Sequence, residues 1–127
     1  MEAQKKRFLD NGNQTVTDLS TGLTWDQREP KYMKWQSAVD YAKESNHGGY
    51  NDWRLPTLEE LMGLLDRSQL KAPLLDLRFF PGVEANHYWT SETEVMPTGT
   101  AAKYVSFNRG GTGRRNIVQK NCVRLVR

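Results

Sequence analysis

Short β-prone runs open the chain. Phe8-Leu9 and Thr15-Val16-Thr17-Asp18 flank the turn sequence Asn11-Gly12-Asn13-Gln14, and a second turn at 20–22 leads into Leu23-Thr24-Trp25. Runs of this kind separated by Asn-Gly and Thr-Gly turns are typical of hairpins. The pattern therefore predicts a small β meander over residues 8–25.

Two helices are predicted next. From Lys34 to Ser45 the apolar residues recur every three to four positions, which places them on one helical face, and Asn46-His47-Gly48-Gly49 is a stop signal. Thr57-Leu58-Glu59-Glu60 is a capping box, so the second helix should begin at Leu58. Its apolar stripe would be Leu58, Leu61, Leu64 and Leu65.

The second half of the chain is rich in strand signals. Residues 66–86 lack periodicity and contain Pro73, Pro81 and Gly82, which predicts a long, packed loop. Strands are predicted at Tyr88–Ser91, Tyr104–Asn108, Ile117–Gln119 and Cys122–Val126, with Gly110–Gly113 as a hairpin turn. Because helices and strands are segregated along the chain, the order predicts an α+β fold with an antiparallel sheet.

Composition limits the class of protein. A chain of 127 residues suits one domain, and no stretch approaches the ~20 apolar residues of a membrane span. The polar start, residues 1–7, reads as a tail without a retained signal peptide, so we expect the domain to cover residues 8–127. The single cysteine, Cys122, excludes an intrachain disulfide, and the compartment stays open.

The net charge of +3 hides a strong polarity. Residues 1–94 carry 11 basic and 15 acidic side chains, whereas residues 95–127 carry 7 basic and no acidic ones. If the C-terminal segment lies on one face, that face attracts anions such as acidic glycans, nucleic acid or an acidic protein surface. The alternative is a solvated surface without a partner.

Motifs for catalysis are thin. The glycines at 110–113 lack the Lys-Ser/Thr pair of a phosphate loop, and His47 and His87 belong to no metal-ligand cluster. Cys122 lies in an apolar strand pattern and is expected to pack as a small hydrophobe. We therefore predict no enzyme, no metal and no cofactor.

Aromatic, amide and guanidinium groups near the C-terminal turns are the candidate ligand contacts. Such groups stack on sugar rings or pair with sulfate and carboxylate, while nucleic acid is disfavoured because no nucleic-acid-binding motif is present. Trp89 has a competing interpretation as a core aromatic. The candidates are Trp89, Asn108, Arg109, Arg114, Arg115 and Asn116.

Specific strings add to this picture. Asp18–Trp25 (DLSTGLTW), Gly49–Pro56 (GYNDWRLP), Tyr88–Ser91 (YWTS) and Val123–Arg127 (VRLVR) occur in this order. Together they resemble the Lcl C-terminal domain, a bacterial family of unknown function found at the end of a collagen-like adhesin. The resemblance runs from about Phe8 to the last residue.

The resemblance also implies a fold. Asp52–Pro56 followed by Thr57–Leu61 is similar to a segment of formylglycine-generating enzymes, whose wider group has a C-type-lectin-like fold with two helices on a twisted antiparallel sheet, long loops and neighbouring termini. The best-matched residues then become structural, with Trp53 in the core and Asp52 and Arg54 holding loop backbone. This structural set is Trp25, Asp52, Trp53, Arg54, Thr57 and Glu60.

Two departures from the relatives matter. The helix position where family members commonly have a cysteine is Ala42, and a second such position is Leu125, so the family's presumed disulfide is absent and its usual export or cell-surface location is less secure. One thiol also cannot form the two-cysteine copper site of the oxidases. We expect a non-catalytic, adhesion-type module that binds an anionic glycan or a protein surface, with a variable-loop recognition module and an oxidase relative using Cys122 as alternatives.

Overall fold

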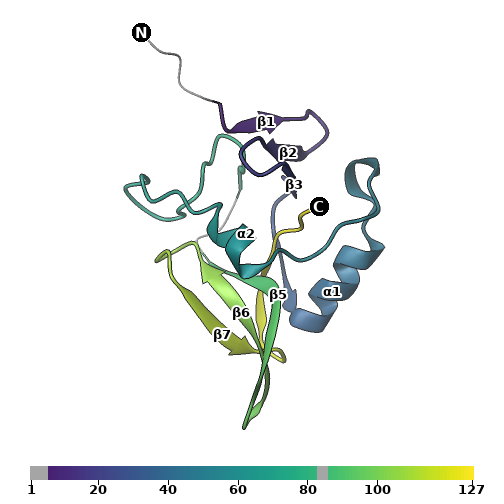
Figure 1. The fold of residues 1–127 in the computed structure, drawn as a ribbon, viewed down its shortest axis with the longest axis vertical. Helices are drawn as coiled ribbons and strands as arrows, with labels where there is room; N and C mark the ends of the chain where they lie inside the picture. The colour runs from purple at the N-terminus through teal and green to yellow at the C-terminus, as the bar shows by residue number, and fades with distance from the viewer. Residues whose placement is uncertain (1–5, 83–85) are drawn as a thin grey trace.

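The computed structural model describes residues 6–82 and 86–127 and contains two sheets and two α-helices (Figure 1). In chain order the elements are β1 (Phe8–Asp10), β2 (Thr15–Asp18), β3 (Leu23–Asp26), β4 (Lys31–Lys34), α1 (Trp35–Glu44), the 3-10 helix η1 (His47–Gly49), α2 (Leu58–Met62), β5 (His87–Met96), β6 (Gly99–Ser106), β7 (Thr112–Asn116) and β8 (Lys120–Val123). The predicted α+β class and the N-terminal meander are confirmed.

The strands form a meander and a larger mixed sheet. Strands β1, β2 and β3 pair antiparallel in chain order, and the second sheet has the order β4-β8-β5-β6-β7. Its pairs are antiparallel except at β5 and β8, which meet through one parallel bridge between Tyr88 and Cys122. The prediction of a purely antiparallel sheet is therefore wrong at this junction, where β8 enters between β4 and β5.

Both faces of the five-stranded sheet carry core. Neighbouring residues of a strand point to opposite faces, so Tyr88 and Trp89 enter different clusters. Tyr88 lies in the cluster that contains Leu61 of α2, while Trp89 lies in the cluster that contains Ala38 of α1. The two helices therefore lie on opposite sides of the sheet.

The predicted capping box of α2 is present. The amide of Glu60 donates to the Thr57 hydroxyl at 3.1 Å, and the Thr57 amide donates to Glu60 Oε1 at 2.9 Å. The helix is short, because it ends at Met62 before Leu64 and Leu65. Both leucines nevertheless pack with the core, Leu64 as a buried residue and Leu65 against the cluster.

The C-terminal residues close the fold by running beside β3. The backbone of Arg127 exchanges hydrogen bonds with Thr24, both of 2.9 Å, and Val126 exchanges bonds of 2.9 and 3.0 Å with Arg54. Val126 is 0% exposed. The C-terminus therefore lies next to the N-terminal meander, where Figure 1 places its label.

The Asp52-Trp53-Arg54 string has the predicted buried centre but different flanking contacts. Trp53 is buried, and its Nε1 donates to the carbonyl of His47 at 3.0 Å. Asp52 and Arg54 were expected to bind loop backbone, but they mainly bind side chains. Arg54 donates to both carboxylate oxygens of Glu60. Asp52 accepts from Arg127 at 2.5 and 3.1 Å. The string thus ties α2 and the C-terminal segment together.

Several strand predictions differ from the structure. The strand predicted at 104–108 is β6, which begins at Gly99, and β7 was not predicted, because its first two residues were assigned to the hairpin turn. Residues 117–119 form a turn, because Asn116 Oδ1 accepts the Val118 amide and Gln119 bonds back to the Asn116 carbonyl. The strand predicted to end at Ser91 continues to Met96 and pairs with β6 as a hairpin, and β4 was not predicted. Most side chains of β4 and of the outer part of β5 are exposed or half-buried.

The structure describes only part of the predicted N-terminal tail, residues 1–7. Residues 1–5 of the predicted tail lie outside the described residues. Arg7, also assigned to that tail, is held by Asp18 at 2.9 Å and by the carbonyl of Gly63 at 2.6 Å. No described helix is long and apolar enough to span a membrane.

Candidate ligand-binding face

Trp89 is not a ligand contact. Its side chain is 0% exposed, and its Nε1 donates to the carbonyl of Met33 at 2.9 Å. It packs with Ala102 and Val123 beneath α1. The prediction that it stacks on a ligand is wrong, and the alternative interpretation as a core aromatic is correct.

The two adjacent arginines of β7 point to opposite faces of the sheet. Arg114 lies opposite Lys103, and Arg115 lies opposite Ala102. Directly paired residues share a face, so Arg114 shares that of Lys103 and Arg115 that of Ala102. A single ligand on one face of the sheet therefore cannot contact both arginines in the same way.

The face that carries Arg114 is largely neutralised. Arg114 Nη1 lies 3.0 Å from Glu94 Oε2, and Lys103 Nζ lies 3.8 Å from Glu92 Oε1. Both acids come from β5, just before the acid-free segment begins. The field of a C-terminal basic patch is therefore weaker here than its sequence suggests.

Two other C-terminal arginines have structural partners. Arg127 pairs with Asp52. Arg124 is 3% exposed, donates to the carbonyls of Asp26 and Arg28, and has its guanidinium carbon 5.0 Å from the ring centre of Phe80. Burial lowers the pKa of Arg124, opposed by nearby Tyr88 and Asp26. Neither arginine is therefore a candidate for a surface contact.

An aromatic pair lies on the opposite face, near Arg115. The rings of His87 on β5 and Tyr104 on β6 stack with centroids 4.2 Å apart and planes 8° apart, and both residues are half-buried. Across the sheet, Gly113 of β7 pairs with Tyr104. A Cβ at Gly113 would lie 2.5 Å from Tyr104 Oη, so the absence of a side chain there makes room for the phenol ring.

Two arginines act on this aromatic pair. Burial lowers the pKa of His87, and the positive charges of Arg115 and Arg109 lower it further. Within the described residues neither arginine has a carboxylate partner. Arg115 Nε is buried without a hydrogen bond there, and the contact of Arg115 Nη2 with Gln119 is long at 3.5 Å. Unused cationic hydrogen-bonding capacity is therefore concentrated beside His87 and Tyr104.

The turn that carries Arg109 is held in place by hydrogen bonds from the long loop predicted at residues 66–86. Arg67 Nη2 donates to the carbonyl of Gly110 at 2.8 Å, and the amide of Leu74 donates to the carbonyl of Phe107 at 2.8 Å. The backbone amide of Arg109 donates to Ser106 Oγ at 3.1 Å. The loop therefore supports the turn while leaving the Arg109 side chain exposed.

The two predicted asparagines have different environments. Asn108 is exposed in the same turn as Arg109. Asn116 uses its Oδ1 to accept the amide of Val118 and so shapes the turn between β7 and β8. Asn108 therefore remains a candidate contact, whereas Asn116 has a structural task.

We call the set His87, Tyr104, Arg109 and Arg115 the His87–Tyr104 face. The sequence predicted Arg109 and Arg115 as ligand contacts but not the stacked aromatic pair. His87 belongs to no metal-ligand cluster, and Tyr104 was predicted only as a strand residue. Gly113 was predicted as part of a hairpin turn but lies in strand β7, where a glycine often marks a close approach by another group. This face can offer planar hydrogen-bond donors and partly exposed rings to an anionic ligand.

Other chemistry finds little support among the described residues. No group of three or more His, Cys, Asp and Glu side chains there could hold a metal ion. Cys122 is 2% exposed and lies in the core cluster of Tyr88.

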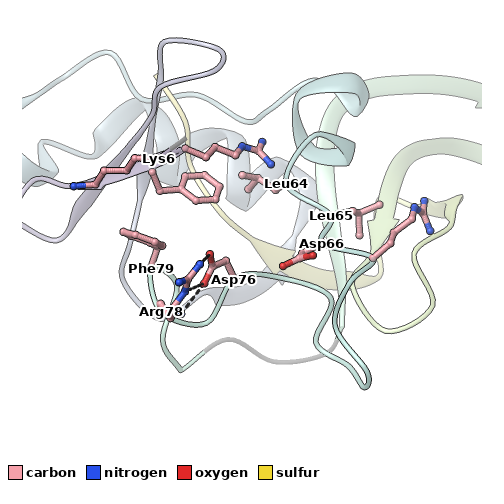
Figure 2. A pocket seen from close by; sticks show the side chains of 10 residues that line it. Lys6, Leu64, Leu65, Asp66, Asp76, Arg78 and Phe79 are labelled. Carbon is pink, nitrogen blue, oxygen red and sulfur yellow. Dashed lines mark hydrogen bonds and ion pairs between the residues drawn. The ribbon is translucent and has the colours of Figure 1, made fainter. Parts of the chain in front are cut away.

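A cavity of about 540 Å³ lies between β1 and the segment 64–79. Figure 2 shows its charged groups: Asp76 faces Arg78, and Asp66 projects toward the same space. Arg78 holds both oxygens of Asp76, at 3.0 and 2.8 Å, while Asp66 accepts from Ser68 and Gln69. These carboxylates are therefore satisfied by neighbouring protein groups, so the cavity is a weaker candidate than the His87–Tyr104 face.

Comparison with known proteins identifies the family. No curated protein matches the chain. The model of the Lcl C-terminal domain matches residues 14–127, which includes both sheets apart from β1 and every residue of the His87–Tyr104 face. The chain therefore belongs to the Lcl C-terminal domain family.

Proposed function

We propose that this protein is a non-catalytic binding module that holds an acidic glycan on the His87–Tyr104 face. The proposal rests on one observation. Arg109 and Arg115 have no carboxylate partner among the described residues, and the positive charges of both act on His87, which stacks on Tyr104. A guanidinium matches sulfate and carboxylate groups with two parallel hydrogen bonds, and aromatic rings pack on the CH groups of sugars.

The proposed fold group fits this function. We propose a C-type-lectin-like domain on the basis of two helices on opposite sides of a twisted sheet and a C-terminal segment that returns to the N-terminal meander. In folds of this group ligands tend to be met by long loops and exposed strands. The Arg109 turn and the edge strand β7 are such elements here.

Retention on immobilised heparin tests the proposal with two double variants of equal charge. Arg109→Ala/Arg115→Ala removes the two arginines of the His87–Tyr104 face, and Lys103→Ala/Arg114→Ala removes two cations that already pair with Glu92 and Glu94. We expect the first variant to elute at clearly lower salt than the second. Equal retention of both variants would mean that net charge alone drives binding.

A protein partner is the second candidate. The same arginines would pair with carboxylates on an acidic protein surface. The segments 86–100 and 108–116, which were expected to be loops, consist largely of strands β5 and β7, so specificity would be set by exposed strand residues and by the turn at Arg109. A panel of acidic glycans separates the two candidates, because a protein-recognition module should bind none of them above background. An oxidase using Cys122 is disfavoured by the burial of its thiol, since a catalytic thiolate must be accessible.

A further inference from the structure

A second concave site lies away from the His87–Tyr104 face. A groove of about 430 Å³ runs between α1 and the extended residues 53–57. Trp35 and Val39, one helical turn apart, form its wall on α1, while Trp53 and Leu55 form the opposite wall. The groove is therefore a slot lined mainly by hydrocarbon.

The polar groups in this slot are mostly occupied. Trp35 Nε1 donates to the carbonyl of Thr90 at 2.9 Å, and Trp53 Nε1 donates to that of His47, so both indoles offer only their rings. Arg54, at the edge, holds both oxygens of Glu60 at 2.7 and 2.9 Å. A ligand would therefore find apolar walls and few hydrogen-bonding partners among these residues.

The hydroxyl-bearing residues Thr57 and Ser91 also line the groove, and Lys43 is its one cation without an acidic partner in the described residues. It is exposed at the rim of the groove, and within residues 6–82 and 86–127 its ammonium group has neither a carboxylate within 4.0 Å nor a hydrogen bond. An apolar slot with one available cation at its edge is complementary to a molecule with a hydrocarbon body and one negative group. Such a molecule leaves no polar atom buried and unpaired.

We propose that this groove binds a small apolar carboxylate, whose hydrocarbon chain lies between Val39 and Leu55 and whose carboxylate pairs with Lys43. The groove volume falls at the lower end of the ~300–1,000 Å³ that is common for small-molecule sites. A peptide fits the slot less well, because its backbone amides would meet few partners there. The proposal uses no residue of the His87–Tyr104 face and stands independently of glycan binding.

An NMR titration with octanoate, monitored at the four indole N–H signals, tests this site. We expect the signals of Trp35 and Trp53 to shift while that of fully buried Trp25 stays in place. Octan-1-ol, which keeps the chain and lacks the charge, should bind more weakly. Lys43→Met should weaken octanoate binding roughly two- to fivefold, as expected for an exposed ion pair.

Lys34→Met is the matched control, since it removes the charge of another exposed lysine outside the groove. It should leave the octanoate affinity unchanged. The proposal is overturned if the signals of Trp35 and Trp53 do not respond to octanoate. It is also overturned if octan-1-ol binds as tightly as octanoate and Lys43→Met has no effect beyond that of Lys34→Met.

Discussion

Glu60 carries two tasks with one carboxylate. It closes the capping box of α2 by accepting the Thr57 amide, and it binds Arg54 with both oxygens. The Arg54 guanidinium is the main reason that the pKa of Glu60 falls from 4.5 to about 2, and the Thr57 amide adds to the effect against the opposing effect of burial. The string from Asp52 to Glu60 is therefore an electrostatic unit as well as a helix start.

This lowered pKa gives a pH prediction. A carboxyl group whose pKa is lower in the folded state stabilises the fold above its unfolded pKa, and this stabilisation is lost as the pH falls from about 4.5 to about 2. Glu60→Gln, which keeps a capping-box residue, should lower the free energy of unfolding at pH 7 by about 1 kcal/mol, because Arg54 is partly exposed. Urea denaturation at pH 7 and pH 2 measures it, and a difference that persists unchanged at pH 2 would contradict the assignment.

Gly113 is the residue on which the aromatic pair depends. An added Cβ would lie 2.5 Å from Tyr104 Oη and 2.6 Å from Cζ, so Gly113→Ala should push the phenol ring away from His87. We expect a changed His87 ring signal in the NMR spectrum and a stability loss of about 1–2 kcal/mol. Gly111→Ala is the control, since its Cβ meets no atom within 4 Å. Equal effects of both substitutions would show that the Gly113 contact is unimportant.

At the scale of elements, local signals predicted the beginnings of helices better than the extents of strands. The three-to-four spacing of α1 and the capping box of α2 depend on residues close in sequence, and both helices begin within one residue of the predicted positions. Strand β4 is stabilised by pairing with distant β8, and the outer part of β5 by its hairpin with β6, while most of their side chains stay exposed or half-buried. Their sequences therefore carry little of the alternation that would reveal them.

The C-terminal segment is the element that joins the meander to the rest of the fold. Val126 is fully buried and forms bridges with both Trp25 and Arg54, whereas Asp52, which pairs with Arg127, is exposed. Val126→Ala should lower the free energy of unfolding by about 2–3 kcal/mol through the cavity that it leaves. Asp52→Asn should hardly move the urea midpoint, because an exposed ion pair contributes little. A larger shift for Asp52→Asn than for Val126→Ala would reverse this ranking.

At the scale of the whole molecule, the sequence predicted the charge polarity but not which cations remain available. Glu92 and Glu94 precede the acid-free segment and fold back onto Lys103 and Arg114, and Asp52 reaches Arg127 from the middle of the chain. These pairs depend on the tertiary fold and cannot be read from charge counts. What remains is a smaller cationic site on the opposite face, at Arg109 and Arg115.

The most direct test of the proposed glycan site follows the chain's two histidine rings by NMR while a heparin-derived tetrasaccharide is added. The positive charges of Arg109 and Arg115 act on His87, whereas His47 contacts Asp26 and the carbonyl of Gln14. We predict that the His87 signals shift with increasing ligand, that those of His47 stay in place, and that Arg109→Ala/Arg115→Ala abolishes the response. Binding that leaves the His87 signals unchanged would contradict the account.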